Sequence, residues 1–414
     1  MLQRLGFPSV GPHRRFVTAI AVDALGSGVF MPLSMLYFLA ATPLSLLQVG
    51  LAISVASAIA LPAGPLVGSL VDRLGAKHVL LAGNLLQAVG FFAYLVADSF
   101  AAVLFWTIVV TLGRTAFWGS YANIVTAISQ PGERERWFGF LGALRNVGFA
   151  VGGLVSGVAI SIGTDLAFEL VVAINAASYV FALWLLLAVP DPRPAGTHTS
   201  LPGSWATVLA DGPYRLLVVA QVGFSLPMMI LNFALPVYVV TVLDLPGWVT
   251  GVVFTVNCLM VGFGQGLVVN RLTGHVRYRI LLVTQAAFAA SYVVFLGASV
   301  LSVWMATAVI VLGAIVYTLA ELTGGPVLAA TAAEAAPEHL RGRYLSMIQL
   351  AWNLSSAIAP VLFAWLLERG PEPIWLVMLV LAGAFALLTV RLGTALPVAA
   401  ERVTNRAAAP LPTG

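Results

Sequence analysis

The chain has 414 residues, of which 60% are hydrophobic and only 9% are charged, and its formal net charge is +4. Soluble globular proteins carry about 25% charged residues, so this chain cannot cover a water-facing surface, and most of its surface must meet lipid. It contains no basic tract of the kind that binds nucleic acid. A single cysteine, Cys258, lies in an apolar run, which excludes a disulfide framework and a CxxC metal site.

Twelve apolar segments are long enough to cross a bilayer, whose core requires about 20 apolar residues per helix. They predict helices, because the strands of an open sheet would leave unpaired edge groups in lipid. The first segment follows Arg14 and Arg15 and is longer than the apolar region of about 7–15 residues in a cleaved signal. It is therefore predicted to be helix 1. The twelve segments are 16–40, 46–71, 78–97, 101–129, 138–162, 166–189, 214–243, 247–269, 279–299, 301–333, 344–367 and 374–396.

Basic residues alternate along the connections between these segments. Positive loops stay in the cytoplasm, so the pattern predicts that both termini are cytoplasmic. Odd-numbered connections contain only Arg369. One lysine, Lys77, against nineteen arginines indicates a GC-rich bacterial gene, and the predicted location is the bacterial plasma membrane. The even-numbered connections and the chain ends contain Arg4, Arg14, Arg15, Arg73, Lys77, Arg134, Arg136, Arg193, Arg215, Arg271, Arg277, Arg279, Arg341, Arg343, Arg391, Arg402 and Arg406.

The longest connection is rich in Pro, Gly and Thr and lies near the middle of the chain. We interpret it as a cytoplasmic linker between two halves, with a short helix at 203–212. The tail is expected to be disordered from Ala399 onward. The predicted parts are a cytoplasmic N-terminus (1–15), an N-terminal six-helix bundle (16–189), the linker (190–213), a C-terminal six-helix bundle (214–397) and a cytoplasmic tail (398–414).

An internal repeat supports the division into six and six helices. The run 68–75 after helix 2 resembles 266–274 after helix 8, at an offset of 198 residues. The run 134–137 resembles 341–344, at an offset of 207 residues. Intramembrane polar positions correspond at the same offsets: Asp23 falls on Gln221, and Arg114 falls on Glu321.

The loop Gly68-Ser-Leu-Val-Asp72-Arg73-Leu-Gly75-Ala-Lys77 resembles the signature loop between helices 2 and 3 of the major facilitator superfamily. With the twelve spans and the central linker, the resemblance covers about residues 14–396. It implies an all-α membrane protein with twelve transmembrane helices in two pseudo-symmetric six-helix bundles. The cavity between the bundles would open alternately to each side of the membrane.

Within the superfamily the chain looks most like the bacterial proton-coupled drug-efflux branch. Arg114 in helix 4 resembles that branch's intramembrane arginine, although the glycine that follows it is displaced to Gly119. Gly148, Gly152 and Gly153 in helix 5 resemble the antiporter motif, which has proline where Phe149 stands. This departure leaves the direction of transport open.

Four ionisable residues lie within the spans: Asp23, Arg114, Arg145 and Glu321. A charge at mid-helix costs at least about 2.5 kcal/mol, so such residues usually face the interior and serve function. Asp23, Arg114 and Arg145 are expected to cluster, either for proton coupling or as a structural ion pair. Glu321 could be protonated at rest, meet Arg145 or Arg114 across the cavity, or reach water where helix 10 bends. Its predicted role is to carry a proton or to contact a cationic substrate.

The signature loop is interpreted as a cytoplasmic gate. Gly68 would let helices 2 and 11 approach closely, and Gly75 would permit the tight turn. Asp72 would accept hydrogen bonds at the N-terminus of helix 11. Arg73 and Lys77 would anchor the loop at the membrane surface, and for these two residues topogenic charge alone is a sufficient alternative.

Five polar or aromatic residues in otherwise apolar spans are candidates for the substrate cavity. Apolar clefts with a few polar groups suit amphipathic organic ligands. The chain has no Walker A sequence, and its five histidines all fall in loops or at helix ends, which argues against an ATP-driven pump and a buried metal site. The candidates are Asn232, Phe233, Asn257, Trp352 and Asn353.

The sequence therefore predicts a secondary active transporter, not an enzyme. It would act by alternating access, without a cofactor, as a monomer in the lipid bilayer, and would export a small amphipathic compound with a proton gradient as the energy source. Uptake symport or facilitated diffusion by the same fold remains an alternative. A membrane-embedded enzyme is a distant one, since it would need a cluster of nucleophile, base or metal ligands at one depth, and the sequence places none there.

Overall fold

The computed structural model describes residues 10–129, 134–189, 205–337, 340–395 and 401–403, and these parts are almost entirely helical. Glycine residues permit the turns between several helices: Gly75, Gly163, Gly274 and Gly370 adopt positive φ angles at connections. Within the described residues, the single β-type contact is one isolated bridge near the C-terminus.

The helices confirm the twelve predicted segments to within a few residues. The short helix predicted in the linker is present as α9 (Trp205–Ala210), whereas the linker residues 190–204 lie outside the described residues. In chain order the segments are η2–α1–η3–α2 (Gly11–Ala41), α3 (Leu46–Ala60) with α4 (Ala63–Leu74), α5 (Ala76–Tyr94), α6 (Phe100–Ile128), α7 (Arg134–Ile162), α8 (Asp165–Leu187), α10 to η5 (Gly212–Val242), α12 (Trp248–Arg271), α13 with η6 (Arg277–Val300), α14 (Val303–Ala335), α15 (Arg341–Leu367) and α16 (Pro373–Ala395).

Ten of the twelve segments are long and apolar enough to cross a membrane as single helices. The second segment is divided into α3 and α4 at Leu61-Pro62, because proline cannot continue the helix hydrogen-bond ladder. The third segment, α5, carries Lys77, Asn84 and Gln87, which lower its hydropathy. Both segments nevertheless pack within the bundle, so the architecture is twelve spans.

Polar caps mark where several spans begin. Ser45 and Gln48 form a capping box at the start of α3. Ser99, Thr164 and Asp211 each accept a hydrogen bond from a backbone N–H in the first turn of α6, α8 and α10. Since an uncapped helix end leaves orphan donors, these residues explain the start of four apolar segments from local sequence alone.

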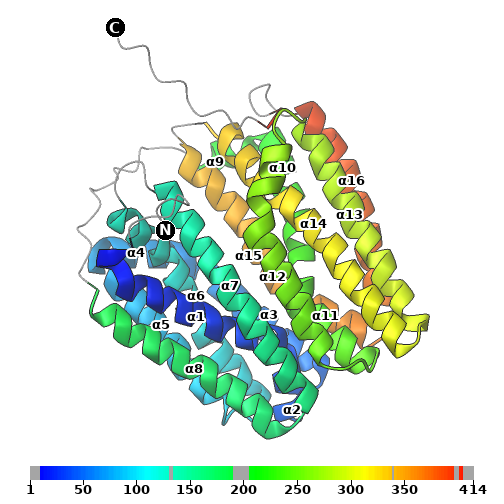
Figure 1. The fold of residues 1–414 in the computed structure, drawn as a ribbon. Coiled ribbons are helices and arrows are strands. Elements are labelled where there is room, and N and C mark those ends of the chain that lie inside the picture. The colour runs from blue at the N-terminus through cyan, green and yellow to red at the C-terminus, as the bar shows by residue number, and fades with distance from the viewer. Residues whose placement is uncertain (1–9, 130–133, 190–204, 338–339, 396–400, 404–414) are drawn as a thin grey trace.

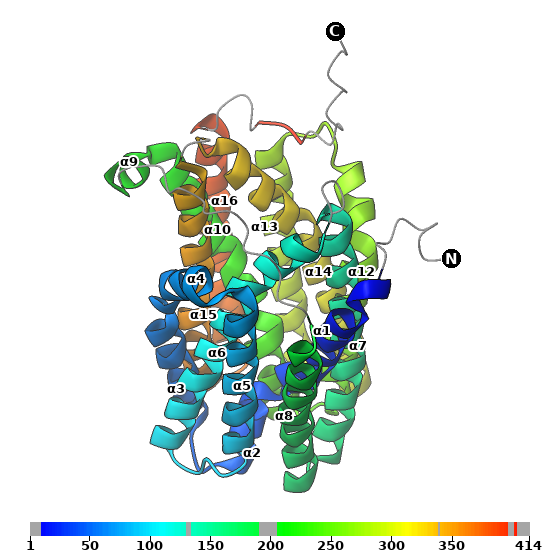
Figure 2. The same ribbon diagram turned by 90° about the vertical axis from the view of Figure 1, so that its left-hand side faces the viewer.

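The helices form two groups that correspond to the two halves of the sequence (Figure 1). In the first, α1 packs on α7 and α8, and α5 packs on α6 and α8; in the second, α13 packs on α14 and α16, and α10 packs on α15 and α16. Figure 2 views the first group from its side, with the second group behind it. Two helix pairs join the groups, α7 with α12 and α3 with α15. The boundaries predicted for the two bundles stay a prediction.

The two ends of the bundle differ in charge. The end at which α4 and α12 finish and α5 and α13 begin carries Arg73, Lys77, Arg271 and Arg277, and we call it the basic end. The opposite end, where α3 begins and α15 finishes, is called the far end.

The C-terminal segment departs from expectation. Disorder from Ala399 is wrong for residues 401–403, which run antiparallel to the loop before α13. Gly274 N–H donates to Val403 O (2.8 Å), Val403 N–H donates to His275 O (3.0 Å), and Arg277 N–H donates to Glu401 O (2.9 Å). Backbone pairing needs no particular side-chain pattern, which is why composition did not reveal it. Residues 396–400 and 404–414 lie outside the described residues.

Candidate functional site

Asp23 and Arg145 form an ion pair inside the first half. An Arg145 Nη1–H donates to Asp23 Oδ2 at 3.0 Å, and both side chains are buried. The pair joins α1 to α7, two helices that pack along much of their length. Removing one partner from such a pair leaves an uncompensated buried charge, at a cost of about 3–5 kcal/mol.

The Arg145 guanidinium also lies against three aromatic rings. Its Cζ is 4.5 Å from the ring centre of Trp118, 5.1 Å from that of Phe149 and 5.7 Å from that of Phe117. Aromatic faces stabilise a cation by about 0.5–2 kcal/mol, and more when water is excluded. Phe149, the residue that replaces the antiporter proline, thus helps to hold the buried arginine.

Arg114 is not part of the Asp23–Arg145 pair. Its side chain is exposed although it lies near the middle of α6, and it is within electrostatic range of the buried Tyr94 and Tyr179 hydroxyls. In the described part of the chain it has no ion-pair or hydrogen-bond partner. The structure therefore brings two of the three expected N-half charges together and leaves Arg114 outside that pair.

Glu321 lies in the second half against α12. Asn257 Nδ2–H donates to Glu321 Oε2 at 2.6 Å and also contacts Thr318 Oγ1 at 3.1 Å. Neither Arg114 nor Arg145 reaches Glu321, so of the alternatives for this residue the cross-cavity ion pair is wrong in this structure. Glu321 has no cationic partner among the described residues. The helix continues past Gly324-Gly325-Pro326 to Ala335, so it is not broken there.

The signature loop is open in this structure. Gly75 makes the turn between α4 and α5 with φ of 85°. Asp72 and Arg73 are exposed, and a β-carbon added to Gly68 would meet no atom within 4 Å. Lys77 Nζ donates to Leu187 O at 3.2 Å, which ties the loop to the end of α8. The predicted contact of Gly68 and Asp72 with the eleventh span, α15, is thus not formed here and stays a prediction for another conformation.

The glycines of α7 allow close packing on two sides. A β-carbon at Gly148 would lie 2.9 Å from Ala24 Cβ, and one at Gly152 would lie 2.5 Å from the backbone of α1. One at Gly153 would lie 2.7 Å from Phe254 of α12 in the other half, and Gly157 meets Gly251 of α12 backbone to backbone. Small residues let helices approach closely in membranes, so α7 joins its own half to the other half.

The candidate cavity residues lie on α12, η4 and α15. Asn257 supports Glu321, as described. Asn232 and Phe233 lie in a π-helical segment, η4 (Ile230–Ala234), and Asn232 O accepts a long hydrogen bond of 3.5 Å from Ser34 Oγ in the other half. Trp352 and Asn353 are half-buried on α15. The segment η4 packs on α15, and the role of these four residues in substrate binding stays a prediction.

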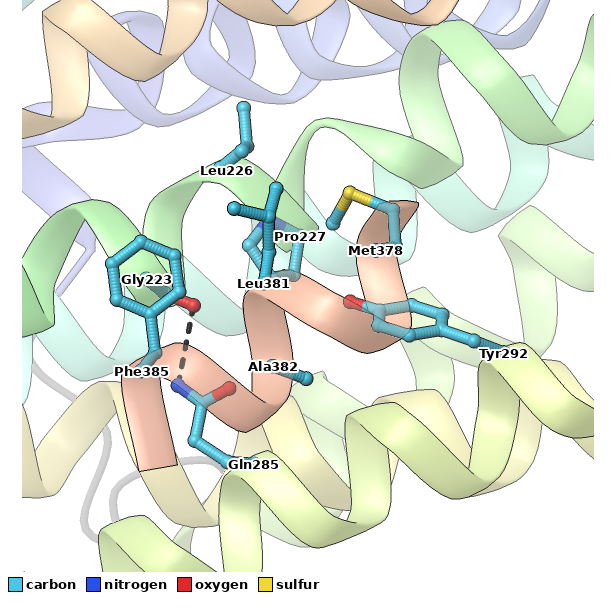
Figure 3. A pocket seen from close by; sticks show the side chains of 9 residues that line it. All are labelled: Gly223, Leu226, Pro227, Gln285, Tyr292, Met378, Leu381, Ala382 and Phe385. Carbon is cyan, nitrogen blue, oxygen red and sulfur yellow. Dashed lines mark hydrogen bonds between the residues drawn. The ribbon is translucent and has the colours of Figure 1, made fainter. Parts of the chain in front are cut away.

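A narrow pocket between α10, α13 and α16 is too small to hold a water molecule, and Figure 3 shows the side chains that line it. Pro227 lacks an N–H, so the Gly223 carbonyl four residues earlier loses its helix partner. Gln285 Nε2–H of α13 donates to that carbonyl at 3.2 Å instead (Figure 3). The remaining lining is mostly apolar, and Gln285 thus supplies the donor that the Gly223 carbonyl loses to Pro227.

Sequence reasoning missed several of these residues. The aromatic neighbours of Arg145 follow no local motif, and only Phe149 was singled out. Gln285 could have been found from its polar side chain in an apolar span. The sequence pattern places Arg277 among the loop charges, whereas in the structure Arg277 is buried and donates to both carboxylate oxygens of Glu334 at 2.6 and 2.7 Å. Within the described ranges, no three His, Cys, Asp or Glu side chains are close enough to hold a metal ion.

Comparison with known proteins shows the class of this chain. The profile of the Major Facilitator Superfamily matches residues 16–360, and the chain belongs to this family. A variant of the nucleoside transporter NupG has a similar fold, with a TM-score of 0.75 at 14% identity over 93% of this chain and all of that protein. A D-xylose–proton symporter has a TM-score of 0.73 at 14% identity, over 92% of this chain and 97% of that one.

Sequence relatives are named for drug resistance. Multidrug resistance protein MdtH of Aeromonas salmonicida is 30% identical over 210 residues, which are 50% of this chain and 52% of that relative. The match therefore spans only about half of the length of that relative. MdtH of Escherichia coli is 24% identical over 92% of this chain and 94% of its own length. The chain is therefore a multi-pass membrane transporter of the major facilitator type, not an enzyme.

Proposed function

We propose that this transporter exports a small amphipathic organic compound and is driven by protons that move in the opposite direction, through alternating access of the two halves. The observation that carries the proposal is the setting of Glu321. Its carboxylate is held inside the membrane by the Asn257 amide and has no cationic partner in the described part of the chain. Such a carboxyl can gain or lose a proton without leaving an unpaired cation behind.

Asp23 is in a different position. Protonation of Asp23 would leave Arg145 buried without its counterion, and this is costly. We therefore assign the proton to Glu321 and interpret the Asp23–Arg145 pair as the support that fixes α1 against α7. Arg114, which lies outside this pair, would contact substrate between the halves.

The relatives support the export direction, since the MdtH proteins of Aeromonas salmonicida and Escherichia coli are named multidrug resistance proteins. The setting that we propose is the bacterial plasma membrane, with both termini in the cytoplasm, because the basic residues are concentrated at one end of the bundle. The transporter would work as a monomer in the lipid bilayer, with the proton gradient as its energy source and without cofactor, metal or nucleic acid.

Uptake or facilitated diffusion is the second candidate. Phe149 on α7 stands where the antiporter motif has proline, and its ring contacts Arg145. The helix therefore departs from the export motif at a residue that supports the buried ion pair. The same experiment distinguishes these functions.

The test uses purified full-length protein in proteoliposomes with an imposed pH gradient and a fluorescent cationic dye as the amphipathic probe. We expect uphill dye movement that a protonophore abolishes. Glu321→Gln should lose uphill movement but retain exchange of dye down its own gradient, since exchange needs no net proton transfer. Glu169→Gln, an exposed carboxylate on α8, is the matched control and should behave as wild type. Full activity after gradient collapse, or in Glu321→Gln, would refute proton coupling through this residue.

A further inference from the structure

The helix pair α3 and α15 joins the two halves from the far end inward. A β-carbon at Gly50 would lie 2.6 Å from Pro360 O and 2.7 Å from Ala364 Cβ, so the two backbones are in close contact. One turn further in, Val361 N–H donates to Ser54 Oγ at 3.0 Å. The two helices are antiparallel, because the start of α3 meets the end of α15.

At the far end itself, a carboxylate of one half meets the N-terminus of a helix in the other. Leu47 N–H donates to Glu368 Oε1 at 2.8 Å. The capping box of α3 already uses Ser45 and Gln48, and Leu47 N–H would otherwise be one of the orphan donors of the first turn. A carboxylate is favoured at a helix N-terminus by the helix dipole, and its hydrogen bonds are stronger than those between neutral groups.

Toward the basic end, α4 continues the second span after α3, and it makes no extensive contact with α15 among the described residues. Added β-carbons at Gly64 and Gly68 would meet no atom within 4 Å, and Asp72 at the end of α4 is exposed. The second span and α15 are therefore in contact at the far end and apart at the basic end. Reversal of this arrangement requires the Leu47–Glu368 contact to break, because it bridges the halves where they would have to part.

We propose that Glu368 is the far-end latch: its hydrogen bond to Leu47 holds the far end closed in this conformation, and its loss favours the conformation open at the far end. The inference rests on alternating access by this transporter, as proposed above. It concerns a position outside the signature loop and outside the four intramembrane charges. The contact is exposed to water, so its effect is limited to about a two- to fivefold change in the ratio of the two conformations, as follows from a dipole contribution of about 0.3–1 kcal/mol.

The test measures conformation directly and needs no substrate. In a Cys258→Ser background, spin labels on cysteines at Asp98 and Val300, both exposed in far-end loops of opposite halves, report the far-end separation by pulsed electron paramagnetic resonance in nanodiscs. We expect Glu368→Ala to increase the population with the longer distance about two- to fivefold. Glu368→Gln, which keeps an acceptor oxygen but loses the charge, should lie between Glu368→Ala and wild type, and Glu169→Ala should match wild type.

An unchanged distance distribution in Glu368→Ala would overturn the latch, whatever the transport assay shows. A single distance in wild type and every variant would also overturn it, because no second conformation would then exist for the latch to oppose. Loss of proton coupling in the dye assay, with a normal response of the distances to Glu368→Ala, would instead refute the proposed coupling and leave the latch intact.

Discussion

The two halves of this transporter hold their intramembrane carboxylates differently. Asp23 in the first half is paired with Arg145, whose guanidinium is covered by three aromatic rings. Glu321 in the second half is held by an amide and has no counterion among the described residues. A carboxylate in an ion pair is suited to fixing helices, whereas one held by neutral groups is suited to exchanging a proton. The comparison teaches that the pseudo-symmetry of the halves does not extend to their chemistry.

The largest expected effect concerns the ion pair. Arg145→Gln should lower the stability of the protein by about 3–5 kcal/mol, because it leaves Asp23 charged and buried without a partner. Thermal unfolding in detergent, followed by tryptophan fluorescence, measures the change. The double variant Asp23→Asn/Arg145→Gln should recover part of the loss, since both charges are then absent. If the single and double variants lost the same amount of stability, restoring charge balance would have no effect and the ion pair would not account for the loss.

The amide that holds Glu321 should have an intermediate effect. Asn257→Leu removes the donor and leaves the Glu321 carboxylate without its hydrogen bond, at a cost of about 1–3 kcal/mol. Glu321→Gln should lower the stability less than Asn257→Leu does, because a neutral amide can keep a hydrogen bond with Asn257. Unfolding midpoints of the two variants under the same conditions provide the comparison. If Glu321→Gln lowered the stability as much as Arg145→Gln does, the two halves would not differ in this respect.

The smallest effect is expected at Trp118. Trp118→Leu removes the aromatic face nearest to Arg145 and should cost about 0.5–1 kcal/mol beyond lost packing, because the ring is partly exposed. Trp184, an exposed tryptophan on α8 without a cationic neighbour in the described residues, provides the matched control as Trp184→Leu. The excess of the first loss over the second measures the contribution of the cation–π contact, and no excess would argue against it.

Much of the fold could be predicted from residues read one by one. Apolar length gave the twelve spans, and the capping residues Ser45, Ser99, Thr164 and Asp211 mark the starts of four of them. The division of the second span was not foreseen, because Pro62 can either kink or break a helix, and neighbouring helices decide which.

The candidate site could be predicted only in part. All four intramembrane ionisable residues could be identified from the sequence, because a charge inside a membrane span costs free energy and is therefore rare there. Which of them meet was not predictable, because partners such as Asp23 and Arg145 are 122 residues apart. The separation of Arg114 from this pair, and the hydrogen bond from Asn257 to Glu321, depend on the rotation of each helix about its axis. Packing sets that rotation.

The sequence by itself therefore determined the class of protein, its twelve spans and the short list of charges in the membrane, because hydrophobic length and the cost of burying charge are local properties. The tertiary structure alone decided which charges pair, which helices join the halves and which end is closed. Those contacts, Asp23 with Arg145, Gly157 with Gly251 and Leu47 with Glu368, link residues far apart in the chain. They exist only when two helices approach closely, and no local pattern records that approach.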